Sequence, residues 1–346
     1  MAVKISTITD VARLSGVSAG TVSKYINNPE LVKEKNRCAI AQAIDVLNYT
    51  PNSLAQKLGS GRSDTILLFL ISEDMISEST WLHQLPLIQV FGDFLRNTKY
   101  NLQIEIGQVN APEESCRFIE RCINGKNIDA VAILSAWEIP KSIVMMLTKK
   151  EFPFVLIDNH NPILRHNEII FDNVKMVEQL VDHLVEKGHR KIGFITVRTG
   201  QQHIQDRFKG FTNAMKHHGL DIDNNLICDG DFSIGSGYAS MNRLLKSGHT
   251  PSAMVCGNDN MAVGAINAIK SNGLKVPEDI SVVGIDNSIV AEAVDPMLTT
   301  MELPMADIGR FAIESLLKRI ENDAYEIKTI IFPCKMIERR SVAVVK

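Results

Sequence analysis

The sequence predicts a small all-α helix-turn-helix head followed by an α/β body of two doubly wound parallel-sheet lobes. At 346 residues the chain is longer than one ordinary domain, so a small module joined to a larger body is expected. The first 50 residues carry helix caps and apolar residues at helical spacing. From residue 64 onward, strand-length apolar runs alternate with helix-length segments.

The first two helices are marked by their caps. Thr7 followed three residues later by Asp10 resembles a capping box, and Gly16 suits the left-handed residue that ends a helix. Ser18 can cap a second helix immediately afterwards. Two short helices joined by a tight glycine turn predict a helix-turn-helix.

A third helix supplies the remaining core of the head. Its apolar residues, from Ile40 to Leu47, recur at helical spacing and form one stripe. In the second helix Val22 and Ile26 are four residues apart and are expected to pack inward. The opposite face is small and polar and consists of Gly20, Ser23, Lys24 and Asn27.

The body contains eight strand-like apolar runs, a number that suits two doubly wound lobes rather than one. Ligands of open α/β sheets bind beyond the carboxyl ends of the strands, so polar residues that follow these runs are candidates for a binding site. The runs are residues 66–71, 102–106, 130–134, 154–158, 191–197, 226–231, 253–258 and 281–286.

Composition excludes several classes of protein. Hydrophobic residues at 45% and charged residues at 22% are near globular averages, which argues against extended disorder. The longest apolar runs fall far short of the roughly 20 residues of a membrane helix, and the N-terminus lacks the apolar region of a secretory signal. We therefore expect a cytoplasmic protein without a membrane span.

The six cysteines are scattered, with no C-x-x-C pair and no histidine at zinc spacing. We expect reduced, mostly buried thiols, and neither a metal nor a cofactor. The sequence also lacks a Walker loop, a G-x-S-x-G elbow, an H-E-x-x-H motif and a dinucleotide fingerprint. We expect no catalytic residues and no enzyme activity.

Charge is distributed unevenly along the chain. Residues 1–62 carry eight basic and four acidic side chains, whereas the remainder carries 29 basic and 36 acidic ones. A basic head on an acidic body suits a polyanionic partner for the head alone, although a solvated charged face would give the same count.

At this point the residues become recognisable. The segments TITDVARLSGVSAGTVSKYINNPELV and LNYTPNSLAQKLGSGRSDTI resemble the LacI/GalR family of bacterial transcription regulators. The resemblance continues through VEKGHRKIGFI, DRFKGFTNAM, GNDNMAVGAI, SVVGIDN and LTTMELPMADIGRFA, and so covers the whole chain. It implies a homodimer that binds a near-palindromic double-stranded operator, most often as a repressor, under the control of a small-molecule effector.

The resemblance also assigns the residues that contact DNA. Ala19, Gly20 and Lys24 occupy positions that face base edges, where Lys24 can donate to guanine and Gly20 can instead allow close backbone approach. The family more often has arginine at the position of Lys24, which puts bidentate readout in doubt. The expected phosphate contacts, which fix register on the DNA, are Thr21, Ser23 and Asn27. Thr7, Ser18 and Asn52 are further expected DNA contacts.

Pro51 opens a segment that the family uses as a hinge helix. Such a helix forms on DNA and inserts a leucine into the minor groove, and Leu58 occupies that position. A helix of this length is marginal in water, so its coupling to DNA is physically reasonable. The alternative is a plain linker ending in Gly59-Ser60-Gly61.

The body resembles periplasmic sugar-binding proteins, and the resemblance places the effector between the lobes. Arg207 and Asp286 could clamp hydroxyl groups while Phe232 covers an apolar sugar face. Gln201 stands where purine-binding members carry arginine, which disfavours a purine and leaves a sugar or sugar acid. The full set of expected ligand contacts is Trp81, Asp158, Gln201, Arg207, Phe232, Asn258 and Asp286.

Each assignment has a purely structural alternative. Arg207 and Asp286 could form an ion pair with each other, Trp81 and Phe232 could be core residues, and Asn258, like its neighbour Asp259, could cap the next helix. His189 is expected to be structural. Either an inducer or a co-repressor is compatible with the sequence.

The predicted domains are a helix-turn-helix domain at 1–50, a hinge helix and linker at 51–63, and a ligand-sensing and dimerisation domain at 64–346. The first lobe is expected at about 64–159 and the second at about 160–295, with C-terminal segments that cross between them. A solute-binding component of a transport system is the alternative function that the body alone would permit.

Overall fold

The computed structural model describes residues 6–49, 62–72, 84–135, 137–159, 164, 166–197 and 202–345. The chain forms two compact units, residues 1–64 and 65–346, which we call the head and the body. Each unit has its own hydrophobic core and is described separately below.

The head consists of three short helices, and the capping residues lie where the sequence predicts them. Thr7 caps the first helix with a complete capping box to Asp10, and Gly16 ends it in the left-handed conformation. Ser18 caps the second helix, and the fully buried Val22 packs into the core of the head. The helices are α1 (Ile8–Ser15), α2 (Ala19–Asn27) and α3 (Glu34–Leu47), with a 3-10 turn, η1, at Pro29–Leu31.

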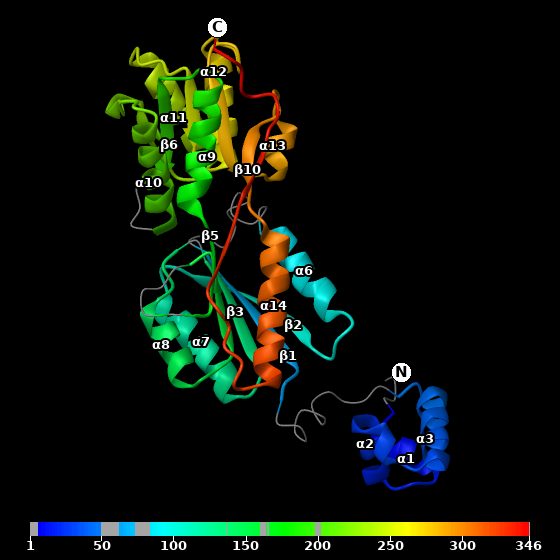
Figure 1. Ribbon diagram of the computed structural model, residues 1–346. Helices are drawn as coiled ribbons and strands as arrows, with labels where there is room; N and C mark the ends of the chain where they lie inside the picture. The colour runs from blue at the N-terminus through cyan, green and yellow to red at the C-terminus, as the bar shows by residue number, and fades with distance from the viewer. Residues whose placement is uncertain are drawn as a thin grey trace. The chain divides into compact units, whose positions relative to one another are not determined.

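The first lobe of the body is built on a parallel sheet with the strand order β11-β5-β4-β3-β1-β2. Helices α6 (Leu85–Leu95) and α14 (Met305–Glu321) cover one face, and α7 (Pro112–Asn124) and α8 (Lys141–Lys149) cover the other (Figure 1). The strands are β1 (Thr65–Ser72), β2 (Asn101–Gln108), β3 (Ala130–Ser135), β4 (Phe154–Ile157), β5 (Glu168–Phe171) and β11 (Ile330–Phe332).

Burial on both faces explains the continuous apolar run of β1. Ile66 and Leu68 belong to the core under α6 and α14, whereas Leu67 and Phe69 belong to the core under α7 and α8. Every residue of β1 is buried, so the strand lacks the alternation of a half-exposed strand.

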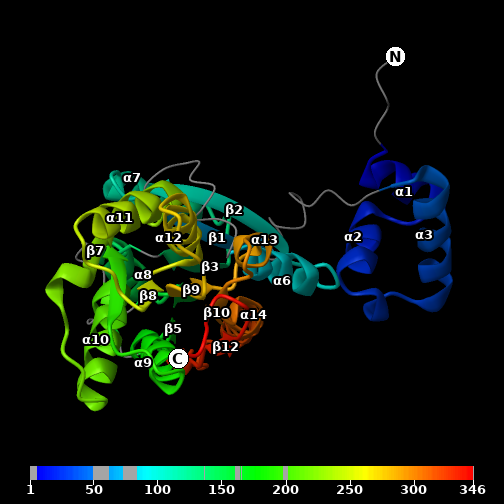
Figure 2. The same cartoon turned by 90° about the horizontal axis from the view of Figure 1, so that it is seen from above.

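The second lobe repeats this arrangement with the strand order β12-β10-β9-β8-β6-β7, in which β12 is antiparallel to β10. Helices α9 (Asn173–Glu186) and α10 (Gln202–His217) lie on one side of the sheet, and α11 (Ile234–Lys246) and α12 (Asp259–Ser271) on the other (Figure 2). A short helix, α13 (Ile289–Ala293), follows β9, and a 3-10 turn, η2 (Asn224–Leu226), precedes β7. The strands are β6 (Ile192–Val197), β7 (Ile227–Gly230), β8 (Ala253–Cys256), β9 (Ser281–Asp286), β10 (Thr299–Glu302) and β12 (Lys335–Ile337).

Three described segments cross between the lobes, at residue 172, at residues 303–304 and at residues 333–334 (Figure 1). The first lobe therefore extends past its expected limit at about 159, and the second lobe continues past about 295, where crossing C-terminal segments were expected. Strand β5 still belongs to the first sheet, and β10 extends the second sheet past residue 295. Both strands have only four residues, which is too short for their apolar pattern to show which sheet they join.

All eight predicted strands are present, while β5, β10, β11 and β12 were not predicted. No helix in the described ranges is both long and apolar enough to cross a membrane. Among the residues that the structure describes, no cluster of three His, Cys, Asp or Glu could hold a metal ion. All six cysteines are free thiols; three are buried, Cys116 and Cys334 are half-buried, and Cys38 is exposed.

Candidate functional site

In the head, helix α2 is oriented by its cap and by one buried anchor. The Ser18 hydroxyl accepts a hydrogen bond from the Thr21 backbone N–H at 3.1 Å and contacts the Thr21 hydroxyl at 2.9 Å. Val22 on the same helix is fully buried. This anchoring leaves Ala19, Gly20 and Lys24 exposed, as expected for residues that face a partner.

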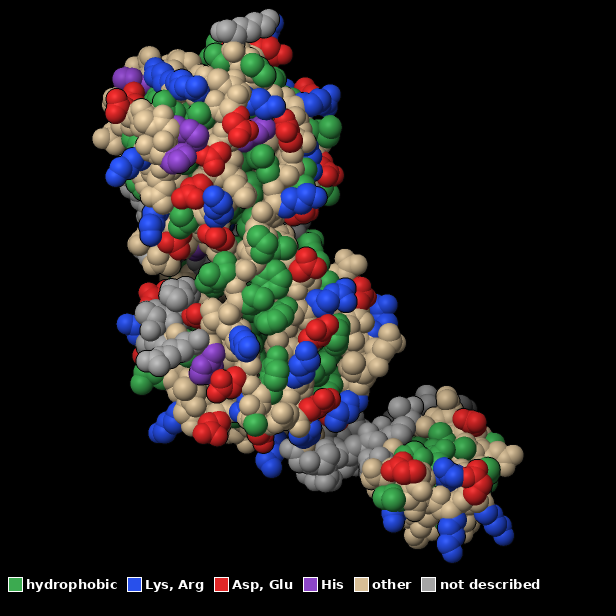
Figure 3. Space-filling model, in the orientation of Figure 1, with side chains coloured by type: hydrophobic (Ala, Val, Ile, Leu, Met, Phe, Trp, Pro, Cys, Tyr) green, Lys and Arg blue, Asp and Glu red, His purple; other side chains and the backbone are tan. Residues whose placement is uncertain are grey.

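The surface of the head shows Lys and Arg side chains (Figure 3). Lys33 is exposed. Lys33 occupies the N-cap position of α3, where its ammonium group, which only donates hydrogen bonds, cannot accept one from the backbone N–H groups of the helix. Thr7, an expected DNA contact, caps α1. The side chain of Asn27 and all of Asn52 and Leu58 lie outside the described residues.

In the body, the expected ligand contacts gather at the carboxyl ends of the strands. Asp158 directly follows β4 of the first lobe, and Asp286 ends β9 of the second. Phe232 lies two residues beyond β7, and Arg207 projects from α10. Trp81 and Gln201 lie outside the described residues.

Electrostatic interactions show that the two lobes bring three of these charges together. Burial is the largest effect on Asp158 and raises its pKa to about 7, while Arg207 opposes this rise and Asp286 adds to it. Burial likewise raises the pKa of Asp286 to about 7, again opposed by Arg207. One carboxylate from the first lobe therefore lies near a guanidinium and a carboxylate from the second.

Arg207 is buried, and its neighbours within the second lobe hold it in place. Its Nε donates to Asn173 Oδ1 at 3.0 Å, and its Nη1 donates to the Gly257 carbonyl at 2.6 Å. In the described part of the chain, no hydrogen bond or ion pair joins Arg207 to Asp286 directly. Arg207 and Asp286 are therefore not held in place by an ion pair with each other.

The backbone is unusual where the candidate ligand contacts lie. Asp158 has a φ of 55°, Phe232 of 69°, Asp286 of 121° and Asn287 of 52°. Residues other than glycine rarely adopt positive φ, and where the surrounding structure enforces it the site is often functional. Sequence reasoning named three of these four residues without any sign of their backbone conformation.

Phe232 and Asn258 are joined to each other. The Asn258 Nδ2 donates to the Phe232 carbonyl at 3.0 Å, and its Oδ1 accepts from the Met261 N–H at 2.9 Å. Asn258 therefore caps α12, which supports the structural alternative over direct ligand contact. The ring of the half-buried Phe232 stacks on His203, with centroids 6.4 Å apart.

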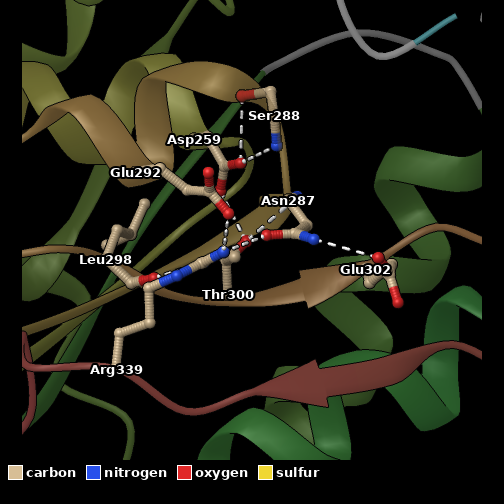
Figure 4. A network of polar contacts seen from close by, with 8 residues as sticks. All are labelled: Asp259, Asn287, Ser288, Glu292, Leu298, Thr300, Glu302 and Arg339. Carbon is tan, nitrogen blue, oxygen red and sulfur yellow. Dashed lines mark hydrogen bonds and ion pairs between the residues drawn. The ribbon is translucent and has the colours of Figure 1, made fainter.

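Asp259 does not cap the helix, and in this respect the sequence-based expectation was wrong. Its carboxylate is fully buried and accepts hydrogen bonds from the Ser288 backbone, the Ser288 hydroxyl and the Thr300 hydroxyl, as Figure 4 shows. His189 is structural as expected, because its ring bonds to Ser252 and to the Ala343 carbonyl.

Sequence reasoning missed several residues around the site. Asn173, which holds Arg207, directly follows the first crossing between the lobes. Cys334 lies in the third crossing, and burial raises its thiol pKa to about 12. The charge of Arg207 lowers this pKa, and the charge of Asp158 raises it. No local motif marks either residue, because each reaches the site from a distant part of the chain.

Comparisons with known proteins agree with this geometry. Residues 7–52 match the bacterial regulatory proteins of the lacI family, and residues 181–342 match the periplasmic binding protein-like domain. The HTH-type transcriptional repressor PurR of Klebsiella pneumoniae is 33% identical over 341 residues, which is 98% of this chain and 97% of that protein. PurR of Photobacterium profundum is 30% identical, over 98% of this chain and 99% of that protein.

Solved structures show the same fold. The Lac repressor dimer bound to operator and the anti-inducer ONPF has a TM-score of 0.86 at 24% identity, covering 98% of this chain and 100% of that one. The complex of the transcriptional regulator CelR with cellobiose has a TM-score of 0.71 at 27% identity, covering 97% of this chain and 99% of that one.

Proposed function

Because this chain belongs to the lacI family of bacterial regulatory proteins, we propose that it represses transcription by binding a specific operator, under the control of a small molecule held between its lobes. The observation that carries the proposal is the pairing, in one chain, of an exposed α2 face with a body that gathers Asp158, Arg207 and Asp286 from both lobes. The family consists of transcription regulators and not of enzymes.

For the head, we assign base contact to Lys24, assisted by the small residues Ala19 and Gly20. One head covers only a half-site, so the protein acts as a homodimer on a near-palindromic operator. Thr21, Ser23 and Asn27 contact the DNA phosphates, Thr7, Ser18 and Asn52 are further DNA contacts, and Leu58 inserts into the minor groove. A DNA-binding repressor acts where the chromosome is, so we place the protein in the cytoplasm.

For the body, a sugar or sugar derivative is the effector class that the site best supports. Carboxylates beside a guanidinium suit vicinal hydroxyl groups, and an aromatic ring such as Phe232 suits the apolar face of a sugar. The relative CelR was solved with cellobiose, which favours the same class. A transport component is disfavoured, since the similarity to the repressors extends over the head as well as the body.

The test is selection of the bound sequence from a random duplex library, followed by affinity measurements on the selected site. We expect a near-palindrome to be enriched, and we expect Lys24→Ala to weaken binding by about 1–3 kcal/mol and to relax preference at one base pair per half-site. Lys35→Ala, at an exposed position on α3, should leave the base preference unchanged. Enrichment of no sequence at all would refute the proposed function.

A further inference from the structure

The turn that follows β9 carries the candidate ligand contact Asp286 in a conformation that the chain does not adopt by itself. Asp286 has a φ of 121° and Asn287 a φ of 52°, and neither residue is glycine. Asparagine tolerates left-handed φ, but the φ of Asp286 lies outside that region and persists only where surrounding contacts enforce it. The contacts that hold this turn therefore decide where the Asp286 carboxylate points.

One side of the turn is held by Asp259. Its Oδ2 accepts from the Ser288 N–H at 2.8 Å and from the Ser288 hydroxyl at 3.1 Å, and its Oδ1 accepts from the Thr300 hydroxyl at 2.5 Å. All of these bonds stay within the core of the second lobe (Figure 4). They fix the turn relative to α12 and β10.

The other side is held by the side-chain amide of Asn287. Its Nδ2 donates to Glu302 Oε1 at 3.0 Å, and its Oδ1 accepts from Arg339 Nη2 at 2.7 Å (Figure 4). Arg339 is itself fixed by the Leu298 carbonyl and the Glu292 carboxylate, each at 2.9 Å. One amide thus bridges an acidic and a basic side chain.

One partner of Asn287 adjoins a crossing, and the other lies at the far end of the strand that follows another crossing. Glu302 is the last residue of β10, and Leu303 and Pro304 then lead into α14 of the first lobe. Arg339 follows β12, the strand that the chain enters directly after its third crossing. A change in the path of residues 303–304 would therefore reach the amide directly through Glu302, and a change at residues 333–334 would reach it through strand β12 and Arg339.

We propose that Asn287 is a positioning residue that couples the ligand site to the relative orientation of the lobes, through its bonds to Glu302 and Arg339. The inference rests on the proposed function, since it concerns the same ligand site. A ligand shifts a conformational equilibrium only by binding one state better than the other. Because this turn is hydrogen-bonded to Glu302 and Arg339, Asp286 takes a different position in each lobe orientation. The ligand therefore binds the two lobe orientations with different affinities.

The hydrogen bond between Asn287 and Glu302 can be tested by exchanging the charge between these two positions. Asn287→Asp keeps a residue that tolerates left-handed backbone and keeps the acceptor for Arg339, but it places a carboxylate against Glu302. Adding Glu302→Gln restores a donor and an acceptor at that contact and returns the net charge to its original value. The double variant should therefore recover what the single variant loses.

The first readout is hydrogen–deuterium exchange of the full-length protein without any ligand. Asn287→Asp should speed exchange about fivefold or more in peptides that cover residues 303–305 and 338–341, and the double variant should return within about twofold of wild type. Asn167→Gly is the matched control, because Asn167 also has positive φ but lies before β5 in the first lobe. Unchanged exchange in these peptides, or no recovery in the double variant, would overturn the inference.

The second measurement distinguishes a residue that couples the ligand site to operator binding from one that only supports the structure of the ligand site. The sugar used is the one from a panel beginning with cellobiose that most changes the operator affinity of wild type. Asn287→Asp should bind that sugar with an affinity within about fivefold of wild type. Most of the sugar's effect on operator binding should nevertheless be lost in this variant. A parallel loss of sugar affinity and effect would contradict the positioning role. A wild type that binds no operator, or responds to no sugar, refutes the proposed function instead, and the exchange measurement still decides the inference.

Discussion

Arg207 has two possible kinds of importance, and the structure shows how to separate them. Its guanidinium is buried and bonded to Asn173 and to the Gly257 carbonyl, while it also lies near two carboxylates from different lobes. Arg207→Ala leaves those acceptors unpaired and should lower the free energy of unfolding by about 1–3 kcal/mol. It should also retain operator binding and lose most of the effector response.

Melting temperature, operator affinity and effector response measured on the same variant test this prediction. Asn173→Ala is the control, because it removes one hydrogen bond to the guanidinium while leaving the charge in place. An Arg207→Ala protein that melts early but responds normally to effector would remove Arg207 from the ligand site.

Asp259 should make stability depend on pH. Burial, followed by repulsion from Asp286, raises the pKa of its carboxyl to about 8, whereas an unfolded aspartate titrates near 3.9. The folded state therefore binds the proton more tightly, so this contribution to stability is fully present below about pH 4 and is lost as the pH rises toward 8.

Replacing Asp259 with asparagine removes this titration. Between pH 5 and pH 8 the free energy of unfolding of Asp259→Asn should fall less steeply than that of wild type, by up to about 1.4 kcal/mol per pH unit. Urea unfolding at a series of pH values measures the slope, with the exposed Asp221→Asn as control. Equal slopes for wild type and Asp259→Asn would show that the carboxyl is ionised throughout.

The residues of the site differ in how far the sequence could reveal them. Asp158 and Asp286 follow strand-like runs, and Arg207 lies in a segment that resembles the family, so chain position was enough to identify them. Arg339 meets Asn287 across 52 residues of sequence, and Asn173 meets Arg207 across 34. Such pairs depend on the path of the crossings, which local patterns do not encode.

Among the helices and strands, the sequence predicted those that have a local pattern of their own, such as a helix cap or an apolar run. The caps of α1 and α2 and the long buried strands such as β1 were confirmed. Strands β10 and β12 were missed because their sequences, TTME and KMI, are not the continuous apolar runs that mark the equally short β4 and β8. Both strands form by pairing with distant partners. The shortness of β5 displaced the expected lobe limit.

The hinge segment gives a prediction that concerns residues outside the described ranges. Leu58→Ala should weaken operator binding much more than binding to random DNA, because a leucine wedge acts only where the duplex is kinked. Titrations on both kinds of duplex at equal salt concentration provide the comparison. Equal losses on the two would show that residues 51–61 serve as a plain linker.

For the whole molecule, we predict a homodimer at working concentrations. Twofold symmetry in the protein matches twofold symmetry in a near-palindromic operator, and two half-sites are needed for tight binding. Sedimentation of the free protein and of its complex with one operator duplex should give two chains in each case. A monomer that binds one duplex singly would contradict the prediction.

The three crossings also determine when each lobe can be completed during synthesis of the chain. A ribosome that has joined the first 300 residues has not yet supplied α14 and β11 to the first lobe, nor β12 to the second. The head by contrast has its whole core, from Val11 to Tyr49, near the beginning of the chain. A prematurely terminated chain would therefore carry a head with a complete core on a body that lacks α14, β11 and β12.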